Sequence, residues 1–426
     1  MKSKLTTWIF LAMLAGIAVG WMCHALLPTP ELAKTVAGYI SLITDIFLRL
    51  IKMIIAPLVF STLVVGIAHM GDTKAIGRIG IKTMGWFVVA SLVSLLLGLV
   101  LVNLLRPGDG LNLPLPEAGA ASSLKTSSLS LKEFVTHLVP RSVFEAMANN
   151  EILQIVVFSV FFGGAAAGFG DKARTVIDWV EQVSHVMLKV TSYVMGLAPV
   201  AVFAAMASIV TTQGLGILWT YGTFMGEFYL GIVLLWVLLA AAGFVFLGPR
   251  VFRLLALVRE PILLAFSTAS SEAAYPKTLE QLERFGASKK ITSFVLPLGY
   301  SFNLDGSMMY CTFAALFIAQ AYGVHLSAGQ QLTMLLILMV TSKGMAGVPR
   351  ASLVVIAATL ATFNIPEAGL LLIMGIDQFL DMGRSATNVV GNSIATAVVS
   401  KWEGELKPEA EAQREIDVDE GLPAAA

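Results

Sequence analysis

The feature that most constrains this chain is a series of long apolar segments. Six of them reach the length that a helix needs to cross the hydrocarbon core of a bilayer, about 20 residues. The chain is 57% hydrophobic and 13% charged, whereas soluble domains average about 45–50% apolar and about 25% charged residues. We therefore expect an all-α membrane protein that crosses the bilayer several times. The six segments are residues 8–27, 40–70, 83–105, 152–169, 186–210 and 216–247.

Charge and cysteine content exclude several classes of partner. Lys and Arg together number 28, as do Asp and Glu, so the net charge is zero. This balance gives no indication of the basic surface that nucleic acids require. Cys23 and Cys311 lie in apolar segments without the spacing of metal ligands. We expect no nucleic-acid partner, no metal centre and no cofactor.

Basic residues in the connecting segments predict the orientation, because cationic loops are retained in the cytoplasm. Residues 211–216 and 322–331, on the other side of the predicted membrane, contain neither Lys nor Arg. The first segment, 8–27, resembles a signal peptide, but it is long enough to span and lacks a small-x-small cleavage site. We expect it to be the first spanning helix, with a cytoplasmic N-terminus. The basic residues on the cytoplasmic side are Lys2, Lys4, Lys74, Arg78, Lys82, Lys172, Arg174, Arg250, Arg253 and Arg259.

Two later segments are apolar but interrupted. In the first, a short apolar arm at 261–266 runs into the sequence STASSEAAYP. In the second, SKGMAGVPR divides the apolar residues of 332–361. Such backbone at membrane depth is tolerated only where it is buried in protein or lines a watery cavity. We expect two re-entrant hairpins, at about 251–285 and 328–362, each followed by a long helix, as in an inverted repeat with a site between the hairpins.

Polar residues recur at helical spacing near the end of the chain. At 3.6 residues per turn they form one stripe, which cannot face lipid. One alternative is that Asp381 and Arg384 form a merely structural pair, since side chains three residues apart interact on a helix. Ionisable residues within a membrane are costly, however, and a paired cation and anion suit a zwitterion that carries an extra carboxylate. The stripe consists of Asp377, Asp381, Arg384, Ser385, Asn388 and Asn392.

A second polar motif, NLDG beginning at Asn303, lies inside the apolar segment 291–320. This sequence favours a turn, so the helix is predicted to unwind there and to expose backbone carbonyls. Those carbonyls and the side chains of Asn303 and Asp305 suit a small cation. The alternative is a structural kink, for which a carboxylate at mid-membrane would be an expensive choice.

The first hairpin tip adds Ser270, Ser271 and Glu272. The serines offer hydroxyl and backbone N–H groups to an anionic substrate, although serine is often just a small residue at a helix contact. No His or Lys is placed to activate Ser271 as a nucleophile, so we do not expect an enzyme. Polar stripes also line channels, but two closing hairpins and a paired site favour a transporter that occludes its cargo.

Four motifs in the same order resemble those of the dicarboxylate/amino acid:cation symporters, which include the glutamate transporters. A fifth, PLVFST at 57–62, resembles the second helix of that family, and the likeness extends to about Lys401. The chain is most similar to the bacterial proton-glutamate symporters, which implies a location in the bacterial inner membrane. The four motifs are SSE at 270–272, NLDGS at 303–307, GMAGVP at 344–349 and DMGRSATN at 381–388.

The resemblance implies eight transmembrane helices, two hairpins and a homotrimer that works as an elevator, with a transport domain moving against a scaffold. It further implies that Arg384 binds the side-chain carboxylate of an acidic amino acid, Asp381 its amino group and Asn388 its main-chain carboxylate. Ser270, Ser271, Ser385 and Gly347 would complete this substrate site. The implied division is scaffold helices 1–2 at 1–82, transport-domain helix 3 at 83–105, an extracellular loop and scaffold helices 4–5 at 106–215, and the remaining transport domain at 216–401. The acidic segment 402–426 lacks apolar periodicity and is predicted to be a disordered cytoplasmic tail.

Departures from the family pattern bear on the coupling ion. Sodium-coupled members usually have Met at the position of Leu304, Asp at Asn392, and Tyr and Thr at Phe87 and Ala90. A residual sodium site would consist of Gly299, Asn303, Asn388 and Asn392. Since a hard cation needs several oxygen ligands and negative charge, we predict weakened sodium binding.

The remaining coupling residues are Ser91, Asn303 and Asp305. The predicted proton carrier is Asp305 or Glu272, unless Glu272 simply pairs with Arg384 or Lys343. The predicted activity is proton-coupled uptake of glutamate or aspartate. The alternatives are sodium coupling and a C4-dicarboxylate substrate.

Overall fold

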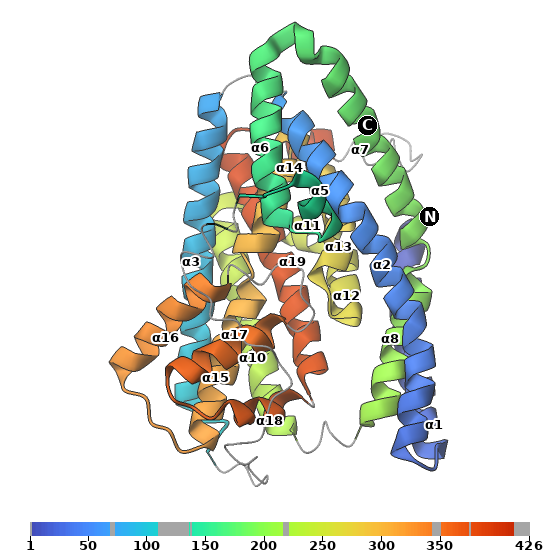
Figure 1. Ribbon diagram of the computed structural model, residues 1–426, viewed down its shortest axis with the longest axis vertical. Helices are drawn as coiled ribbons and strands as arrows, with labels where there is room; N and C mark the ends of the chain where they lie inside the picture. Colours follow the sequence, from blue (N-terminus) through green and yellow to red (C-terminus); the bar gives the residue numbers. More distant parts are fainter. Residues whose placement is uncertain are drawn as a thin grey trace.

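The computed structural model describes residues 2–68, 73–109, 136, 139–215, 221–342, 351–374 and 376–412 (Figure 1). These residues are almost entirely helical, and their one strand-like feature is an isolated antiparallel bridge between Ala287 and Leu406. The helices are α1 (Lys2–Leu26), α2 (Pro30–Ala68), α3 (Thr73–Leu105), α5 (Val143–Ala148), α6 (Ile152–Phe169), η1 (Gly170–Ala173), α7 (Arg174–Met195), α8 (Ala198–Gln213), α10 (Gly222–Leu247), α11 (Arg250–Leu257), α12 (Arg259–Thr268), α13 (Ser271–Phe285), α14 (Lys289–Phe302), α15 (Asp305–Ala321), α16 (Ala328–Thr341), α17 (Ala351–Thr362), η3 (Glu367–Gly369), α18 (Leu370–Met374) and α19 (Asp377–Trp402).

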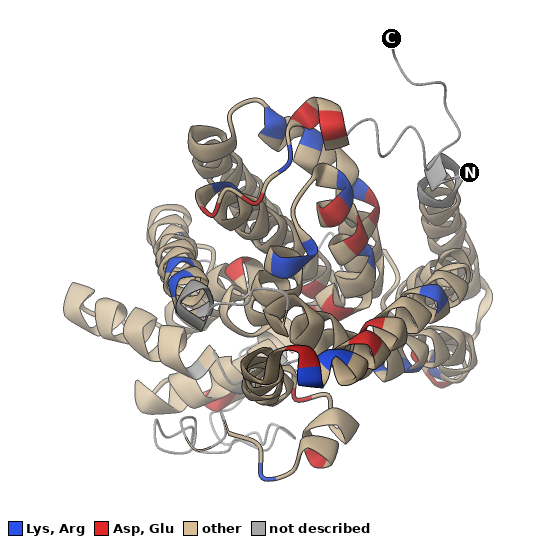
Figure 2. Ribbon diagram, turned by 90° about the horizontal axis from the view of Figure 1, so that it is seen from above, with Lys and Arg blue, Asp and Glu red and all other residues tan. Residues whose placement is uncertain are grey.

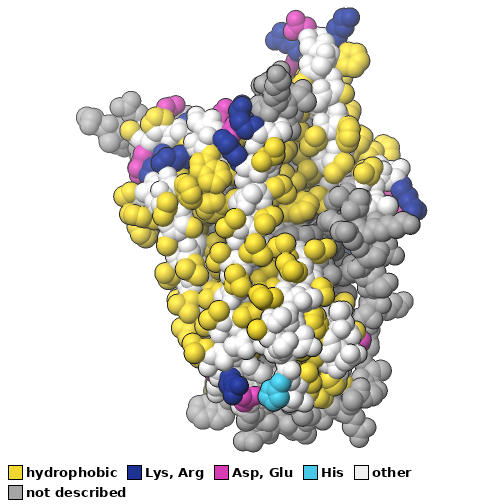
Figure 3. Space-filling model, turned by 90° about the vertical axis from the view of Figure 1, so that its left-hand side faces the viewer, with side chains coloured by type: hydrophobic (Ala, Val, Ile, Leu, Met, Phe, Trp, Pro, Cys, Tyr) yellow, Lys and Arg dark blue, Asp and Glu magenta, His cyan; other side chains and the backbone are white. Residues whose placement is uncertain are grey.

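The helical content and the length of the apolar helices confirm a multi-pass membrane protein. Among the described residues, six helical stretches are apolar and long enough to cross a bilayer. Figure 3 shows the corresponding surface, on which hydrophobic side chains cover the middle of the molecule and charged side chains gather towards its two ends. The six stretches are Thr7–Leu26, Pro30–Ala68, Gly77–Leu105, Ile152–Met195, Gly222–Leu247 and Lys289–Ala321.

One predicted span is divided in the structure. The apolar segment 186–210 falls partly in α7 and partly in α8, which meet at Gly196 and Leu197. Pro199 lies in the first turn of α8, where the backbone N–H groups need no partner within the helix, so proline favours a helix start at this point. Apolar composition alone does not reveal such a break, so the prediction of a single helix over 186–210 is wrong.

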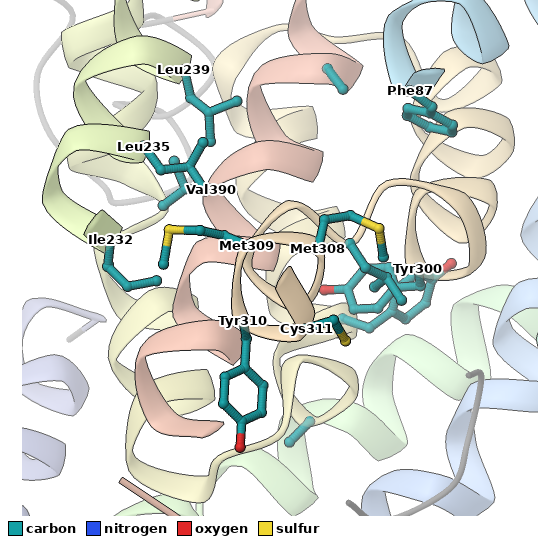
Figure 4. Close-up of a cluster of buried hydrophobic side chains, with 14 of the residues drawn as sticks. Phe87, Ile232, Leu235, Leu239, Tyr300, Met308, Met309, Tyr310, Cys311 and Val390 are labelled. Atoms are coloured by element: carbon teal, nitrogen blue, oxygen red, sulfur yellow. The ribbon is translucent and has the colours of Figure 1, made fainter. Parts of the chain in front are cut away.

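The helices pack in two groups. In the first group α1 lies against α8, and α2 lies against α6, α7 and α8. In the second group α19 is central and contacts α10, α12, α13, α14 and α15, while α3 packs on α15. Figure 4 shows the core between α10, α15 and α19, where Leu235, Met309 and Val390 are buried together. Contacts of α14 with α2 and of α12 with α8 join the two groups.

Two pairs of short helices occupy the predicted hairpin segments 251–285 and 328–362. The helices α12 and α13 pack on each other and are joined at Ala269, whose φ of 50° is left-handed, and Ser270. The helices α16 and α17 also contact each other, and the segment between them lies outside the described residues. In Figure 1, α12 and α13 lie to the right of α19, and α16 and α17 lie to its left.

The chain after α19 differs from the prediction of a disordered tail at 402–426. Residues 403–412 lie against the charged end of the bundle, which Figure 2 shows from above. Glu405 pairs with Lys290 of α14 at 2.9 Å. The charges that indicate a solvated tail therefore form ion pairs instead, and residues 413–426 lie outside the described part of the chain.

Glu403 ties this segment to α3, and its loss is expected to reduce stability. Its carboxylate is 2% exposed and lies 2.7 Å from both Arg78 and Lys82. The hydrogen bonds from Arg78 and the one from Lys82 lower the pKa of Glu403, although burial acts in the opposite direction. A lowered folded pKa stabilises the protein at pH values above the ordinary glutamate pKa, and this stabilisation is lost as the pH falls through the folded value. We expect Glu403→Gln to cost about 1–3 kcal/mol at neutral pH.

The measurement is thermal unfolding of the detergent-solubilised protein at neutral and acidic pH. Glu409→Gln is the matched control, because Glu409 also pairs with an arginine, Arg253, but is 53% exposed. The Glu403 variant should melt at a lower temperature than the control at pH 7, and the difference should shrink in acid. Equal melting temperatures at pH 7 would show that the buried pair adds no stability.

Candidate functional site

The break between α14 and α15 is held open by α19. As predicted from the NLDG motif, α14 ends at Phe302 and α15 begins at Asp305. The first N–H groups of α15 have no partner within the helix, and Asn388 of α19 supplies one. Its Oδ1 accepts from the backbone N–H of Gly306 at 3.0 Å and of Ser307 at 3.3 Å, and its Nδ2 donates to Ser307 Oγ at 3.2 Å. Asn388 therefore caps α15, and binding a substrate carboxylate would require it to exchange one of these partners.

Glycine residues allow α15 and α14 to approach α19 this closely. A Cβ atom on Gly306 would lie 2.3 Å from the backbone oxygen of Arg384. A Cβ atom on Gly391 would overlap the carboxylate of Asp305, and one on Gly299 would overlap the amide of Asn392. Real Cβ atoms do not tolerate such distances, so α15 rests directly on the backbone of α19, whereas α14 packs against the Asn392 side chain.

Arg384 lies where α15, α17 and α19 meet. Its Nε pairs with Asp381, and its Nη1 donates to Ser352 Oγ at 2.7 Å and to Ser307 Oγ at 3.3 Å. The Arg384 and Asp381 side chains are 14% and 10% exposed. A nearly buried cation is therefore balanced by one adjacent anion and surrounded by hydroxyl groups that can exchange partners with a ligand.

A second polar cluster surrounds Asp305, which is fully buried. Its carboxylate accepts hydrogen bonds from Asn303 Nδ2 at 3.1 Å and from Ser94 Oγ at 3.3 Å. Asn303 Nδ2 also donates to Asn392 Oδ1 at 3.2 Å. The predicted residue Ser91 lies one turn away and donates instead to the carbonyl of Phe302 at 3.5 Å. Ser94 thus binds the Asp305 carboxylate. Its spacing of three residues from Ser91, which puts both serines on one helix face, was the sequence feature that could have indicated this role.

Sequence reasoning also missed two partners of the polar stripe. Asp377 is buried and accepts a hydrogen bond of 2.7 Å from the Tyr310 hydroxyl. Asp377 lies four residues before Asp381, so its place in the polar stripe was predictable from spacing. No sequence feature indicates that Tyr310 is its partner. Ser352, which binds Arg384, stands just after the predicted tip of the second hairpin and carries no distinguishing pattern.

The first predicted hairpin tip lies beside α19, because α12 and α13 both pack on it. The Ser270 hydroxyl caps α13 by accepting from the backbone N–H of Ala273 at 3.3 Å. Ser271 begins α13, and Glu272 in its first turn interacts electrostatically with Tyr300 of α14. Ser385 is buried in α19. The predicted residue Gly347 lies outside the described residues.

Comparison with known proteins decides the family. Residues 5–402 match the Sodium:dicarboxylate symporter family. The chain belongs to this family. Members of the Sodium:dicarboxylate symporter family are transporters, so this protein is a symporter of the dicarboxylate/glutamate type and not an enzyme. The assignment confirms the resemblance found in the sequence motifs.

Individual members of the family carry two kinds of name. The chain is 39% identical over 414 residues to the proton/sodium-glutamate symport protein of Bacillus subtilis (strain 168), covering 96% of this chain and 94% of the relative. It is 41% identical over 414 residues to the protein of the same name from Geobacillus stearothermophilus, covering 96% of each. It is 40% identical over 408 residues to the C4-dicarboxylate transport protein of Laribacter hongkongensis, covering 95% of this chain and 91% of the relative. Family membership alone therefore leaves the substrate to be argued from the site.

Proposed function

We propose that this protein takes up glutamate and aspartate together with protons. The observation that carries the proposal is the nearly buried Asp381–Arg384 pair, bordered by hydroxyl groups of α15 and α17. An acidic amino acid brings one ammonium and two carboxylate groups, which match an anion, a cation and the neutral donors nearby.

The charges of this pair distinguish an amino acid from a simple dicarboxylate. When a substrate carboxylate binds Arg384, Asp381 loses the cation that now balances it. The ammonium group of glutamate replaces that cation, whereas succinate has none to offer. An unpaired carboxylate in a nearly buried site costs several kcal/mol. The C4-dicarboxylate alternative, which the names of several relatives favour, therefore requires Asp381 to be protonated.

Competition between substrates tests this argument. We expect unlabelled glutamate or aspartate to displace labelled glutamate, and succinate at the same concentration to leave it bound, because only an amino acid re-pairs Asp381. In Asp381→Asn the discrimination should shrink by at least about tenfold, since the unpaired charge is gone. Displacement by equimolar succinate in the wild type would instead assign the protein to the C4-dicarboxylate carriers.

Proton coupling rests on the groups around Asp305. Its carboxylate is fully buried and receives hydrogen bonds from neutral donors, Asn303 and Ser94. Asn392 supplies an amide where sodium-coupled members usually have a carboxylate, so this cluster has less negative charge to offer a sodium ion. The proposed proton carrier is Asp305, because an ionisable group buried within a membrane is a functional candidate. The alternative is Glu272, which is half-buried at the start of α13.

Uptake of glutamate into proteoliposomes decides the coupling ion. With an inward proton gradient and no sodium, we expect uptake that collapses when a protonophore is added. Asp305→Asn and Glu272→Gln should separate the two candidate carriers, since the variant that lacks the carrier should exchange glutamate but no longer respond to the gradient. Glu409→Gln, at an exposed position, is the control. A requirement for sodium would overturn proton coupling without affecting the substrate assignment.

The proposed transport cycle is an elevator. The first group of helices, α1, α2 and α6–α8, would form a scaffold, and the second group, packed around α19, would carry the cargo across the membrane. The two hairpins would be re-entrant and close over the substrate from opposite sides. We further propose a homotrimer in the bacterial inner membrane. Chemical cross-linking within a bilayer would test the trimer, with three linked chains as the largest expected product.

A further inference from the structure

An apolar pocket of about 730 Å³ lies behind the Arg384 site. It is formed by α1 of the first group and by α10, α11, α12 and α19 of the second group. Its floor on α19 consists of Gly383 and Ala386, so the pocket uses a different face of the helix that presents Arg384. Phe10 and Ile232 belong to its walls. The pocket has the size of a typical site for a small ligand, about 300–1,000 Å³.

The aromatic residues of the pocket wall present carbon atoms to its interior. The Tyr229 hydroxyl donates to the carbonyl of Phe379 at 2.6 Å, and the Trp236 Nε1 donates to Thr387 Oγ1 at 2.8 Å. The polar atoms of both side chains are therefore used in contacts with α19. An occupant of the pocket must be largely hydrocarbon to match this lining.

Arg259 is the charged residue of the lining. It stands at the start of α12 and is exposed. Two nearby arginines are already engaged, because Arg250 donates to the carbonyl of Lys407 at 3.0 Å and Arg253 pairs with Glu409 at 3.4 Å. By contrast, no ion pair joins Arg259 to another residue in the described part of the chain.

The pocket opens towards the face of the protein that meets lipid. Phe10 and Val233, which line it, are 47% and 57% exposed and belong to helices long enough to span a bilayer. A cation at the rim of an apolar pocket suits an amphiphile that carries a negative charge at one end. Arginine binds phosphate through two parallel hydrogen bonds, and basic residues at the cytoplasmic ends of spanning helices bind anionic lipid headgroups.

We propose that this pocket holds an acyl chain of an anionic phospholipid, with the lipid phosphate bound by Arg259. The walls come from both helix groups, so the bound lipid would contact α1 on one side and the backbone of α19 on the other. The proposal concerns lipid binding alone and does not depend on which substrate or ion the protein carries.

Native mass spectrometry of the full-length protein in detergent, titrated with phosphatidylglycerol or phosphatidylcholine, tests the site. We expect phosphatidylglycerol to bind the wild type at least about tenfold more tightly, and Arg259→Gln to remove this preference. Arg174→Gln is the control for charge, because Arg174 is 79% exposed and does not line the pocket. It should bind phosphatidylglycerol as the wild type does.

A second pair of variants tests the pocket itself. Val233→Trp should fill it and weaken the binding of both lipids, whereas Val237→Trp should not, because Val237 is equally exposed, at 58%, but lies outside the lining. Three outcomes would overturn the proposal: unchanged preference in Arg259→Gln, equal binding in the two tryptophan variants, or tighter binding of a free fatty acid than of phosphatidylglycerol.

Discussion

Replacing Arg384 with alanine is expected to lower glutamate and aspartate affinity by more than about 100-fold. Truncating one partner of a buried, hydrogen-bonded charge pair between a protein and its ligand costs about 2–5 kcal/mol of binding free energy, and about 2.7 kcal/mol corresponds to 100-fold in affinity. The variant also loses the hydrogen bonds to Ser307 and Ser352 that join three helices at the site. Equilibrium binding of labelled glutamate to the purified protein is the direct measurement.

The double variant Asp381→Asn with Arg384→Ala separates loss of recognition from loss of folding. It removes both charges of the pair, so neither partner is left without its counter-charge. We expect it to fold and to bind a neutral amino acid more tightly than an acidic one. Arg106→Ala is the control, because Arg106 is 65% exposed and pairs with Asp109 on the surface. Wild-type glutamate and aspartate affinity in Arg384→Ala would refute the assigned role.

Replacing Gly306 with alanine is expected to abolish transport although it adds only one methyl group. The new Cβ would lie 2.3 Å from the carbonyl oxygen of Arg384 and 2.9 Å from Cβ of Thr387. Backbone atoms of a packed helix cannot yield as a flexible side chain would, so α15 must move away from α19. That movement breaks the bonds from Asn388 to the start of α15 and displaces Arg384 from Ser307. We expect a cost of at least about 1–3 kcal/mol in stability and a loss of substrate binding.

Gly85→Ala provides the matched control for this substitution. Gly85 lies inside α3, and a Cβ atom there would have no neighbour within 4 Å. Alanine is the better helix former by about 1 kcal/mol, so this variant should be at least as stable as the wild type. We therefore expect Gly306→Ala to melt at a lower temperature than the wild type and to lose glutamate binding. Gly85→Ala should melt at the same or a higher temperature and should still bind glutamate. Similar behaviour of both would mean that the contact between α15 and α19 is not critical.

The sequence was most informative where a residue is costly in lipid. Aspartate, arginine and asparagine within apolar helices had to be buried in protein, so the stripe of α19 and the break at Asn303 were predictable and both are found. The sequence was least informative where the residues are small or neutral. Ser94 and Ser352 cost little in either environment, and only the packing of α3 and α17 shows that they bind Asp305 and Arg384.

Helix ends were likewise predictable in part. Apolar length predicted the spans, but the interruption of 186–210 depends on a proline whose effect is local. Glu403 shows that charged residues outside the apolar segments are less predictable. A charge near the end of a chain is expected to be solvated, and only the structure shows that Glu403 is paired with Arg78 and Lys82. Sequence alone thus determined the membrane class, the family motifs and the ionisable residues that must be buried. Only the tertiary structure decided which neutral groups bind them, because hydrogen-bond partners far apart in the chain leave no periodic pattern.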